Sequence, residues 1–86
     1  MDKKMIRELK GKAQSIQATV RVGKSGITEQ IISEIAHQLS KKHLIKIKAL
    51  GCDKNEVKLI ASDLSGHTGS ELIDVRGNTI VLWKKS

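Results

Sequence analysis

The sequence predicts an α/β fold, with one domain over residues 1–86 and the element order helix, strand, helix, strand, helix, strand, strand. Apolar residues recur at spacings of three and four in three segments, which is typical of amphipathic helices. Between these segments apolar and polar residues alternate, as in half-buried strands. Strands that alternate with helices favour a parallel pair. We therefore expect one four-stranded mixed sheet, closed by an antiparallel hairpin, with the helices packed on it.

A first helix is expected over about residues 3–14, where Asp2 can cap the first turn. Its apolar stripe consists of Ile6, Leu9, Ala13 and Ile16. Three cations line another face of this helix: Lys3, Arg7 and Lys10. The alternation in ATVRV then predicts a half-buried strand over residues 18–22.

The second helix is expected over about residues 28–41, with Thr28 as its N-cap and Glu29 in the first turn. Ile27 and Ile32 are spaced as a hydrophobic staple. The broad buried face consists of Ile31, Ile32, Ile35, Ala36 and Leu39. A strand follows over residues 43–50, opened by His43. Its isoleucines and Ala49 point to one side, and Lys46 and Lys48 point to the other.

The third helix opens on Asp53 and Glu56, which have the spacing of a capping box. Its buried face consists of Val57, Ile60, Ala61 and Leu64. Gly66 is a natural helix stop, with His67 beyond it. Two final strands, at about residues 71–76 and 79–84, flank Gly77-Asn78, a pair that suits a tight hairpin turn.

The charge of the chain is uneven. The formal net charge is +7, and residues 1–48 contain 11 Lys or Arg against 4 Asp or Glu, whereas residues 49–86 contain 5 of each. Lysine that only maintains solubility need not be distributed in this way. The charge therefore favours a polyanionic partner that contacts the first part of the chain.

The sequence also indicates where in the cell the protein is located. The longest apolar run is a few residues, far below the roughly 20 that a membrane helix needs. The first segment, MDKKMIRELKGK, lacks the apolar region of a secretory signal. Cys52 is the only cysteine, so no internal disulfide can form, and we expect a cytoplasmic protein.

The segment VRVGKSGIT, residues 20–28, raises the question of phosphate binding. Together with the residues before it, it resembles the end of a Walker A motif, but Ala18 occupies the first glycine position. The alternation of Val20 and Val22 also indicates a strand rather than a flexible cradle. No downstream apolar run ends in an aspartate that could bind Mg²⁺. We therefore do not expect nucleotide hydrolysis.

What remains is the G-x-x-G pattern Gly23-Lys24-Ser25-Gly26 between a strand and a helix. Two glycines allow another backbone to approach closely, and the next helix offers unpaired N–H groups and a positive dipole end. Lys24 could pair with a phosphate, and Ser25 could donate a further hydrogen bond. GXXG loops clamp the RNA backbone in this manner in KH domains. A plain strand-to-helix turn is the alternative, but the basic charge nearby favours nucleic-acid binding.

Aromatic content restricts how a nucleic acid could be read. Trp83 is the only aromatic residue, which excludes a stacking platform of the RRM or OB kind. Recognition should rest mainly on phosphate and ribose contacts and weaken steeply with salt. Trp83 itself either stacks on one base at the sheet edge or packs on the core with its N–H at the surface.

No residue pattern indicates catalysis or a cofactor. His37, His43 and His67 are dispersed, and a single cysteine completes no zinc set. His37 and His43 either extend the basic surface or belong to a solvated helix end. No Ser/His/Asp or paired-carboxylate spacing suggests an active site, and Cys52 reads as a packed or turn residue. We expect a non-enzymatic protein without metal, cofactor or small-molecule substrate.

Four segments, in this order along the chain, resemble the CRM domain, named for chloroplast RNA splicing and ribosome maturation: Val22–Thr28, Lys41–Lys48, His67–Gly69 and Gly77–Lys84. The resemblance implies an RNA-binding α/β domain similar to the C-terminal domain of translation initiation factor three. Free-standing prokaryotic members associate with precursors of the large ribosomal subunit, and plant versions act in organellar group II intron splicing. It also implies that Gly23-Lys24-Ser25-Gly26 is the RNA-contacting GxxG loop.

We therefore expect a protein that binds ribosomal RNA during large-subunit assembly, with ribosomal proteins as further partners and no role at a membrane. The expected RNA-binding residues are Lys3, Arg7, Lys10, Arg21, Gly23, Lys24, Ser25, Gly26, Lys41, Lys42, Lys46 and Lys48. One alternative is a basic protein that coats duplex DNA, similar to the Alba family, although Gly26 and the N-terminal helix speak against it. A second is a protein-only adaptor on the ribosome, in which the basic loop would have no role.

Overall fold

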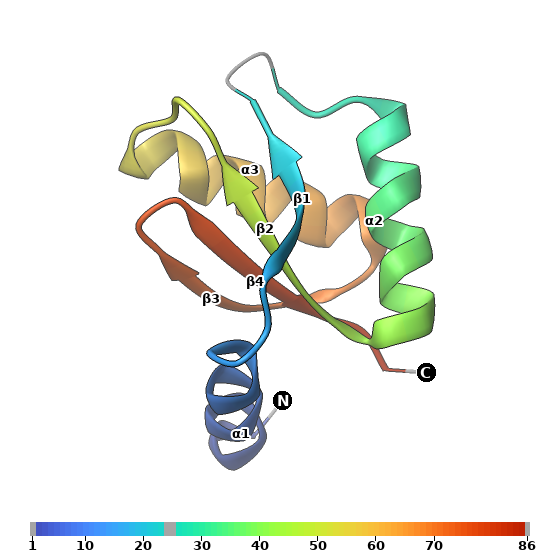
Figure 1. Ribbon diagram of the computed structural model, residues 1–86, viewed down its shortest axis with the longest axis vertical. Helices are drawn as coiled ribbons and strands as arrows, with labels where there is room; N and C mark the ends of the chain where they lie inside the picture. The colour runs from blue at the N-terminus through green and yellow to red at the C-terminus, as the bar shows by residue number, and fades with distance from the viewer. Residues whose placement is uncertain (1, 24–25, 86) are drawn as a thin grey trace.

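The computed structural model describes residues 2–23 and 26–85, and it confirms the expected order of elements (Figure 1). These are α1 (Lys3–Ala13), β1 (Ala18–Val22), α2 (Glu29–Lys42), β2 (Leu44–Ala49), α3 (Lys54–Thr68), β3 (Glu71–Arg76) and β4 (Thr79–Trp83). The strands form one sheet in the order β1-β2-β4-β3. β1 is parallel to β2, whereas β4 is antiparallel to both β2 and β3, so the predicted mixed sheet is confirmed.

Side chains cap the start of each helix where the sequence predicts it. The Asp2 carboxylate accepts a hydrogen bond from the Met5 N–H at 2.8 Å, and the Thr28 hydroxyl accepts one from the Ile31 N–H at 3.2 Å. Asp53 and Glu56 form a reciprocal capping box at the start of α3. Each cap satisfies N–H groups that have no partner within the helix, a contribution of about 1 kcal/mol.

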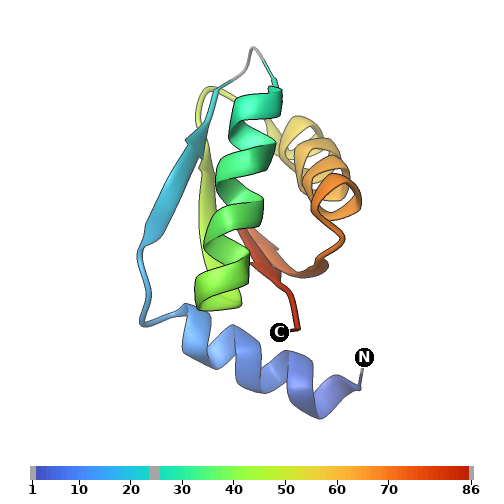
Figure 2. The same cartoon turned by 90° about the vertical axis from the view of Figure 1, so that its right-hand side faces the viewer.

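The main core lies between the sheet and the two helices α2 and α3. Figure 2 shows both helices on the same side of the sheet. The strands contribute Val20, Val22, Ile45, Ile47, Ala49, Ile80 and Leu82, and the helices contribute Ile35, Leu39, Val57, Ala61 and Leu64. Because side chains alternate across a strand, the residues between these point to the opposite face.

That opposite face is only partly covered. α1 packs on one end of it, where Leu9 and Ala13 meet Ile73 and Val81 in a second, smaller core. Met5, Ile6, Leu44 and Trp83 pack around this cluster. Figure 1 shows α1 below the sheet, and no helix among the described residues covers this face above it. The described helices are also too short or too polar to cross a membrane.

The expected stop at Gly66 is wrong, because α3 continues to Thr68. Its buried stripe runs on for another turn, and the Thr68 hydroxyl donates to the Leu64 carbonyl oxygen at 2.7 Å. Gly69 ends the helix in the left-handed region, with φ 64°, and its N–H bonds the Ser65 carbonyl. A glycine ends a helix only where the backbone adopts the left-handed conformation, and α3 adopts it at Gly69. His67 therefore lies in the last turn of α3.

The expectation that His43 opens a strand is also wrong. His43 caps the C-terminus of α2 with φ 66° and ψ −32°, and β2 begins only at Leu44. Its N–H donates to the Leu39 carbonyl at 2.9 Å. Since no glycine follows Lys42, the histidine itself turns the chain from helix to strand. A non-glycine residue in so sparsely populated a conformation is strained by about 1 kcal/mol or more.

Candidate nucleic-acid interface

A glycine turn connects the end of β1 to the start of α2. The Gly26 N–H donates to the Gly23 carbonyl at 3.1 Å, and Gly26 has φ 103°, which other residues rarely adopt. The capped first turn of α2 follows immediately at Thr28. Lys24 and Ser25, which the sequence predicts to contact a phosphate, lie outside the described residues. The backbone of the turn thus leads directly into a helix N-terminus, as anion-binding loops do.

Beside this turn, basic side chains line up across the uncovered face of the sheet. The strand register pairs Arg21 with Lys48, Lys48 with Thr79, and Thr79 with Arg76. Direct partners on neighbouring strands point to the same face. Arg21, Lys48 and Arg76 are exposed, and Thr79 is half-buried between two of them. We call these four residues the basic row.

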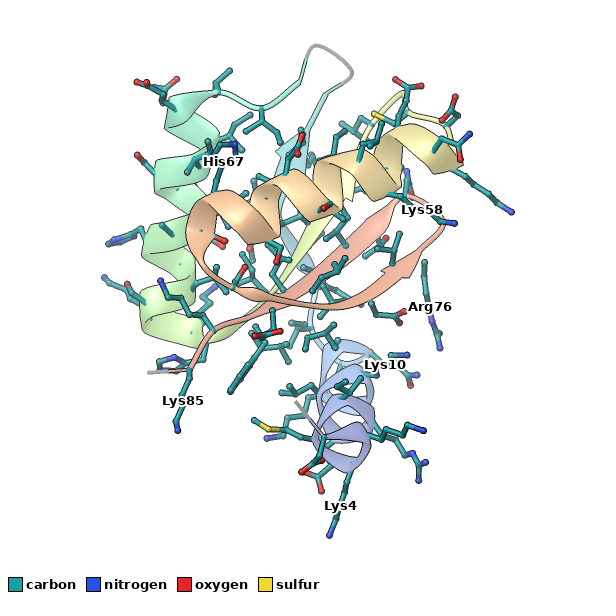
Figure 3. The ribbon with its side chains drawn as sticks, turned by 180° about the vertical axis from the view of Figure 1, so that it is seen from behind. Lys4, Lys10, Lys58, His67, Arg76 and Lys85 are labelled. Atoms are coloured by element: carbon teal, nitrogen blue, oxygen red, sulfur yellow. The ribbon has the colours of Figure 1, made fainter. Side chains whose placement is uncertain are left out.

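Two of the predicted cations adjoin the basic row from below. Lys10 on α1 and Lys46 on β2 line a hollow of about 140 Å³, together with Arg76, Thr79 and Asp74. Figure 3 shows the side chains of Lys10 and Arg76 at the same edge of the molecule. The hollow therefore connects the C-terminal half of α1 with the row on the sheet.

One carboxylate moderates this surface. Asp74 lies 3.3 Å from the Nε of Arg76, and this is the single salt bridge among residues 2–23 and 26–85. The side chain of Asp74 is 20% exposed, while that of Arg76 is 71% exposed, so most of the guanidinium remains accessible. Lys10, Arg21, Lys46 and Lys48 have no carboxylate partner within this part of the chain. Their field is directed outward, which attracts a polyanion.

The remaining predicted cations lie elsewhere. Lys41 and Lys42 are exposed in the last turn of α2, where a positive charge favours the helix dipole. The last turn of α2 lies at the opposite end of this 14-residue helix from the glycine turn, about 20 Å away. Lys3 and Arg7 are exposed on α1, beside Lys10. The predicted set is thus spread over three regions: the glycine turn with the sheet face, α1, and the C-terminal end of α2.

Sequence reasoning missed one cation of the basic row, Arg76. Its half of the chain has no excess charge, so the composition gave no reason to single it out. The hairpin gave a usable signal, because a two-residue turn at Gly77-Asn78 pairs Arg76 with Thr79. Since β4 pairs next to β2, this register brings Arg76 into line with Lys48.

A second hollow, of about 460 Å³, lies at the opposite end of the sheet from the glycine turn. It is lined by Leu9, Lys12, Ser15, Ile16, Lys42, His43, Leu44 and Trp83. Trp83 is half-buried and packs against the α1 cluster, which agrees with the expectation that its ring packs on the core. It does not lie on an edge strand, because β4 is an inner strand of the sheet. We call this cavity the Trp83 hollow.

Metal-binding and reactive groups are sparse. No group of three or more His, Cys, Asp or Glu side chains among the described residues could hold a metal ion. Cys52 is half-buried against the main core, with its Sγ 3.4 Å from the Leu50 carbonyl oxygen. His37 is exposed on α2. What this surface offers chemically is cationic side chains and backbone N–H groups, which are suited to binding anions.

Several known proteins resemble this chain over most of its length. A "Probable RNA-binding protein YqeI" from Bacillus subtilis is 40% identical over an alignment of 86 positions, which covers 96% of this chain and 86% of that protein. An "RNA-binding protein" from Haemophilus influenzae is 32% identical over 78 residues, covering 91% of this chain and 79% of the other. For "Probable RNA-binding protein MJ0652" from Methanocaldococcus jannaschii the identity is 38%, over 95% of this chain and 66% of the relative.

A solved structure has the same fold. The solution structure of SAV1595 from Staphylococcus aureus, described as "a putative RNA binding protein", superposes with a TM-score of 0.89 at 35% identity. The match covers 100% of this chain and 90% of that one. The sequence model of the CRS1/YhbY (CRM) domain matches residues 1–84. The resemblance found in the sequence is thereby confirmed, and the chain belongs to the CRS1/YhbY (CRM) domain family.

Proposed function

We propose that this chain is a non-enzymatic RNA-binding protein that binds ribosomal RNA in a precursor of the large ribosomal subunit. The observation that carries the proposal is the basic row beside the glycine turn, on a sheet face that no described helix covers. The names of the relatives, all RNA-binding proteins, support RNA over other polyanions.

The two parts of this surface contribute differently. At the glycine turn, the absence of side chains on Gly23 and Gly26 lets an RNA backbone approach the first N–H groups of α2. The basic row crosses four strands that are spaced about 4.8 Å apart, so it extends over about 14 Å. It therefore reaches more than one phosphate. Lys46 and Lys10 widen the contact toward α1.

Binding through charge has a measurable signature. Each phosphate that a cation neutralises releases condensed counterions, so affinity falls linearly with salt on logarithmic axes. The basic row carries no aromatic side chain, which leaves phosphate and ribose as its contacts. The 2′-hydroxyl is the group that separates RNA from DNA on such a surface.

The test compares two single substitutions that add the same charge. Gly23→Asp places a carboxylate at the glycine turn, whereas Gly66→Asp places one on α3, behind the sheet, where a new side chain meets nothing within 4 Å. Each variant and the unchanged protein are titrated with a structured ribosomal RNA fragment and with duplex DNA across a salt series. We expect an RNA preference, at least a tenfold loss for Gly23→Asp, and little change for Gly66→Asp. Equal affinity for duplex DNA, untouched by Gly23→Asp, would favour a DNA-coating protein instead.

The role in assembly needs a separate experiment. Ribosomal particles from the native host are separated by sedimentation, and the protein is located by antibody. We expect it on precursors of the large subunit and not on mature subunits, with loss of the association in Gly23→Asp. Equal amounts on mature and precursor particles would contradict a role in assembly while leaving RNA binding intact.

A further inference from the structure

The basic row and the glycine turn leave the Trp83 hollow without a role. It lies at the other end of α2 from the glycine turn, about 20 Å away for a helix of 14 residues. Its volume of about 460 Å³ is within the range of about 300–1,000 Å³ in which small-ligand pockets fall. Three parts of the chain build it: the end of α1 with the residues after it, the end of α2 with the start of β2, and the end of β4.

The walls of the Trp83 hollow combine apolar and aromatic surface. Leu9, Ile16 and Leu44 contribute aliphatic side chains, and Trp83 contributes the one aromatic ring of the chain. Trp83 is only half-buried although it packs on the α1 cluster. A flat aromatic surface beside aliphatic walls is the environment in which an unstacked nucleobase binds, because every base has a π face.

The rim of the same hollow is cationic. Lys12 lies on α1 and Lys42 ends α2, and both side chains are exposed. They come from separate elements, so one hollow combines an aromatic wall with two positive charges. That is the charge pattern of one nucleotide in a strand, an uncharged base flanked by two phosphates.

His43 fixes the shape of this site. It carries the positive φ of 66°, and its backbone is held by bonds to Leu39 and to the Lys84 N–H, the latter at 2.8 Å. The ring Nδ1 lies 3.2 Å from the Lys84 carbonyl oxygen. Because a carbonyl oxygen only accepts, this hydrogen bond requires a proton on Nδ1. Hydrogen bonds to Leu39 and Lys84 thus hold a strained residue beside the hollow, as strained residues are held at preorganised sites.

We propose that the Trp83 hollow binds one unstacked RNA base against the indole ring, with the neighbouring phosphates on Lys12 and Lys42. This rests on the proposed RNA-binding function and adds to it. A single-stranded segment next to a structured region would reach the hollow while the structured region contacts the basic row. The protein then distinguishes RNA with unpaired bases at this distance from uniform duplex.

The test uses an RNA hairpin with a single-stranded extension of about eight nucleotides, within the site sizes of about 4–16 that single-strand binders show. The comparison is the same hairpin with an abasic extension, which keeps the phosphates and lacks the bases. Trp83 is the only aromatic residue, so its fluorescence reports on this hollow alone. We expect quenching by the hairpin with bases and none by the abasic one. Anisotropy of labelled RNA measures overall binding independently.

Two variants sharpen the result. Trp83→Leu keeps an apolar side chain and should weaken binding of the hairpin with bases about 5- to 100-fold, to the level of the abasic hairpin. Lys12→Gln/Lys42→Gln retains the fluorophore and should shift quenching to higher RNA concentration. The matched control, Lys54→Gln/Lys58→Gln on α3, loses the same net charge. In this variant the RNA concentration needed for quenching should rise only as far as the lost net charge explains.

The outcomes separate the two proposals. Binding of both hairpins without quenching, together with unchanged affinity of Trp83→Leu, would overturn the base site and leave the proposed function intact. Equal quenching by the abasic hairpin would also overturn it. Failure of the unchanged protein to bind either hairpin would overturn the proposed RNA binding itself.

Discussion

The two faces of β1 and β2 are made from alternate residues of the same short strands, yet they have opposite properties. On β2, Ile45 and Ile47 are at most 1% exposed beneath α2 and α3, while Lys48 between Ile47 and Ala49 is exposed. On β1, Val22 is fully buried and Arg21 is exposed. The period of two residues therefore divides each strand into a core face and a binding face.

This division separates stability from binding. The core face carries the transfer free energy of its side chains, about 1.5–3 kcal/mol for each large aliphatic one. The exposed cations on the other face contribute little to folding, because cations without partners gain little from one another. Substitutions of neighbouring residues on one strand should therefore affect different quantities, the free energy of unfolding in one case and the RNA affinity in the other.

The largest effect on stability is expected from Ile47→Ala. Ile47 is fully buried, so its truncation loses transfer free energy and leaves a cavity, at a cost of about 2–5 kcal/mol in the free energy of unfolding. The adjacent Lys48→Ala should change this free energy by no more than about 0.5 kcal/mol. Urea unfolding followed by circular dichroism compares the two. Similar losses for both would contradict the division of the strand.

Reversing charge on the uncovered face should give the largest effect on binding. We expect Arg21→Glu/Lys48→Glu to lower RNA affinity about 10- to 100-fold, because phosphate attraction becomes repulsion at two adjacent positions. Lys54→Glu/Lys58→Glu on α3 changes the net charge equally and is the control. Fluorescence anisotropy with labelled RNA measures both. If the control variant loses as much affinity, the effect is one of net charge and the face is not specific.

Two glycines at the C-terminal end of α3 test its stability, because Gly66 lies within the helix and Gly69 caps it. Gly69→Ala should destabilise the fold by about 1 kcal/mol, because alanine is disfavoured at φ 64°. Gly66→Ala should stabilise it by about 0.5–1 kcal/mol, since Gly66 is helical and its added Cβ meets nothing within 4 Å. RNA affinity should change in neither variant. Thermal unfolding tests the signs, and the same sign for both would contradict the helix end at Gly69.

The smallest effect is expected at the far end of the basic row. Asp74→Asn removes the carboxylate beside Arg76, so RNA affinity should rise by a few-fold. Arg76→Gln should lower it by a similar factor, less than a substitution at Arg21, because Arg76 is already partly neutralised. Isothermal titration at low salt resolves such differences. A fall in affinity for Asp74→Asn would contradict the partial neutralisation of Arg76 by Asp74.

Local chemistry made most of the fold predictable. Asp2, Thr28 and Asp53 mark helix starts because their side chains satisfy N–H groups close by in the chain. The two errors, at Gly66 and His43, concern helix ends that packing decides. The buried stripe of α3 carries the helix past one glycine, and the direct connection from α2 to β2 forces a histidine into a glycine-like conformation.

The candidate interface was less predictable, for a topological reason. Composition located the charge in the first part of the chain, and alternation placed Lys46 and Lys48 on one face. It could not bring Arg76 beside them, because that depends on β4 pairing between β2 and β3. The predicted length of the second helix was enough to separate Lys41 and Lys42 from the glycine turn, although the expected RNA-binding set included both. The roles of Lys24 and Ser25 stay predictions from the sequence.

The most direct test of RNA binding at the uncovered sheet face is a map of NMR amide shifts, recorded while the full chain is titrated with a structured ribosomal RNA fragment. We expect the largest changes at Arg21, Gly23 and Lys48, with smaller ones at Thr79 and Arg76. The outer residues of α3, such as Lys58 and Asp63, should not shift. Changes concentrated on α3, with the uncovered sheet face unaffected, would contradict RNA binding at this face.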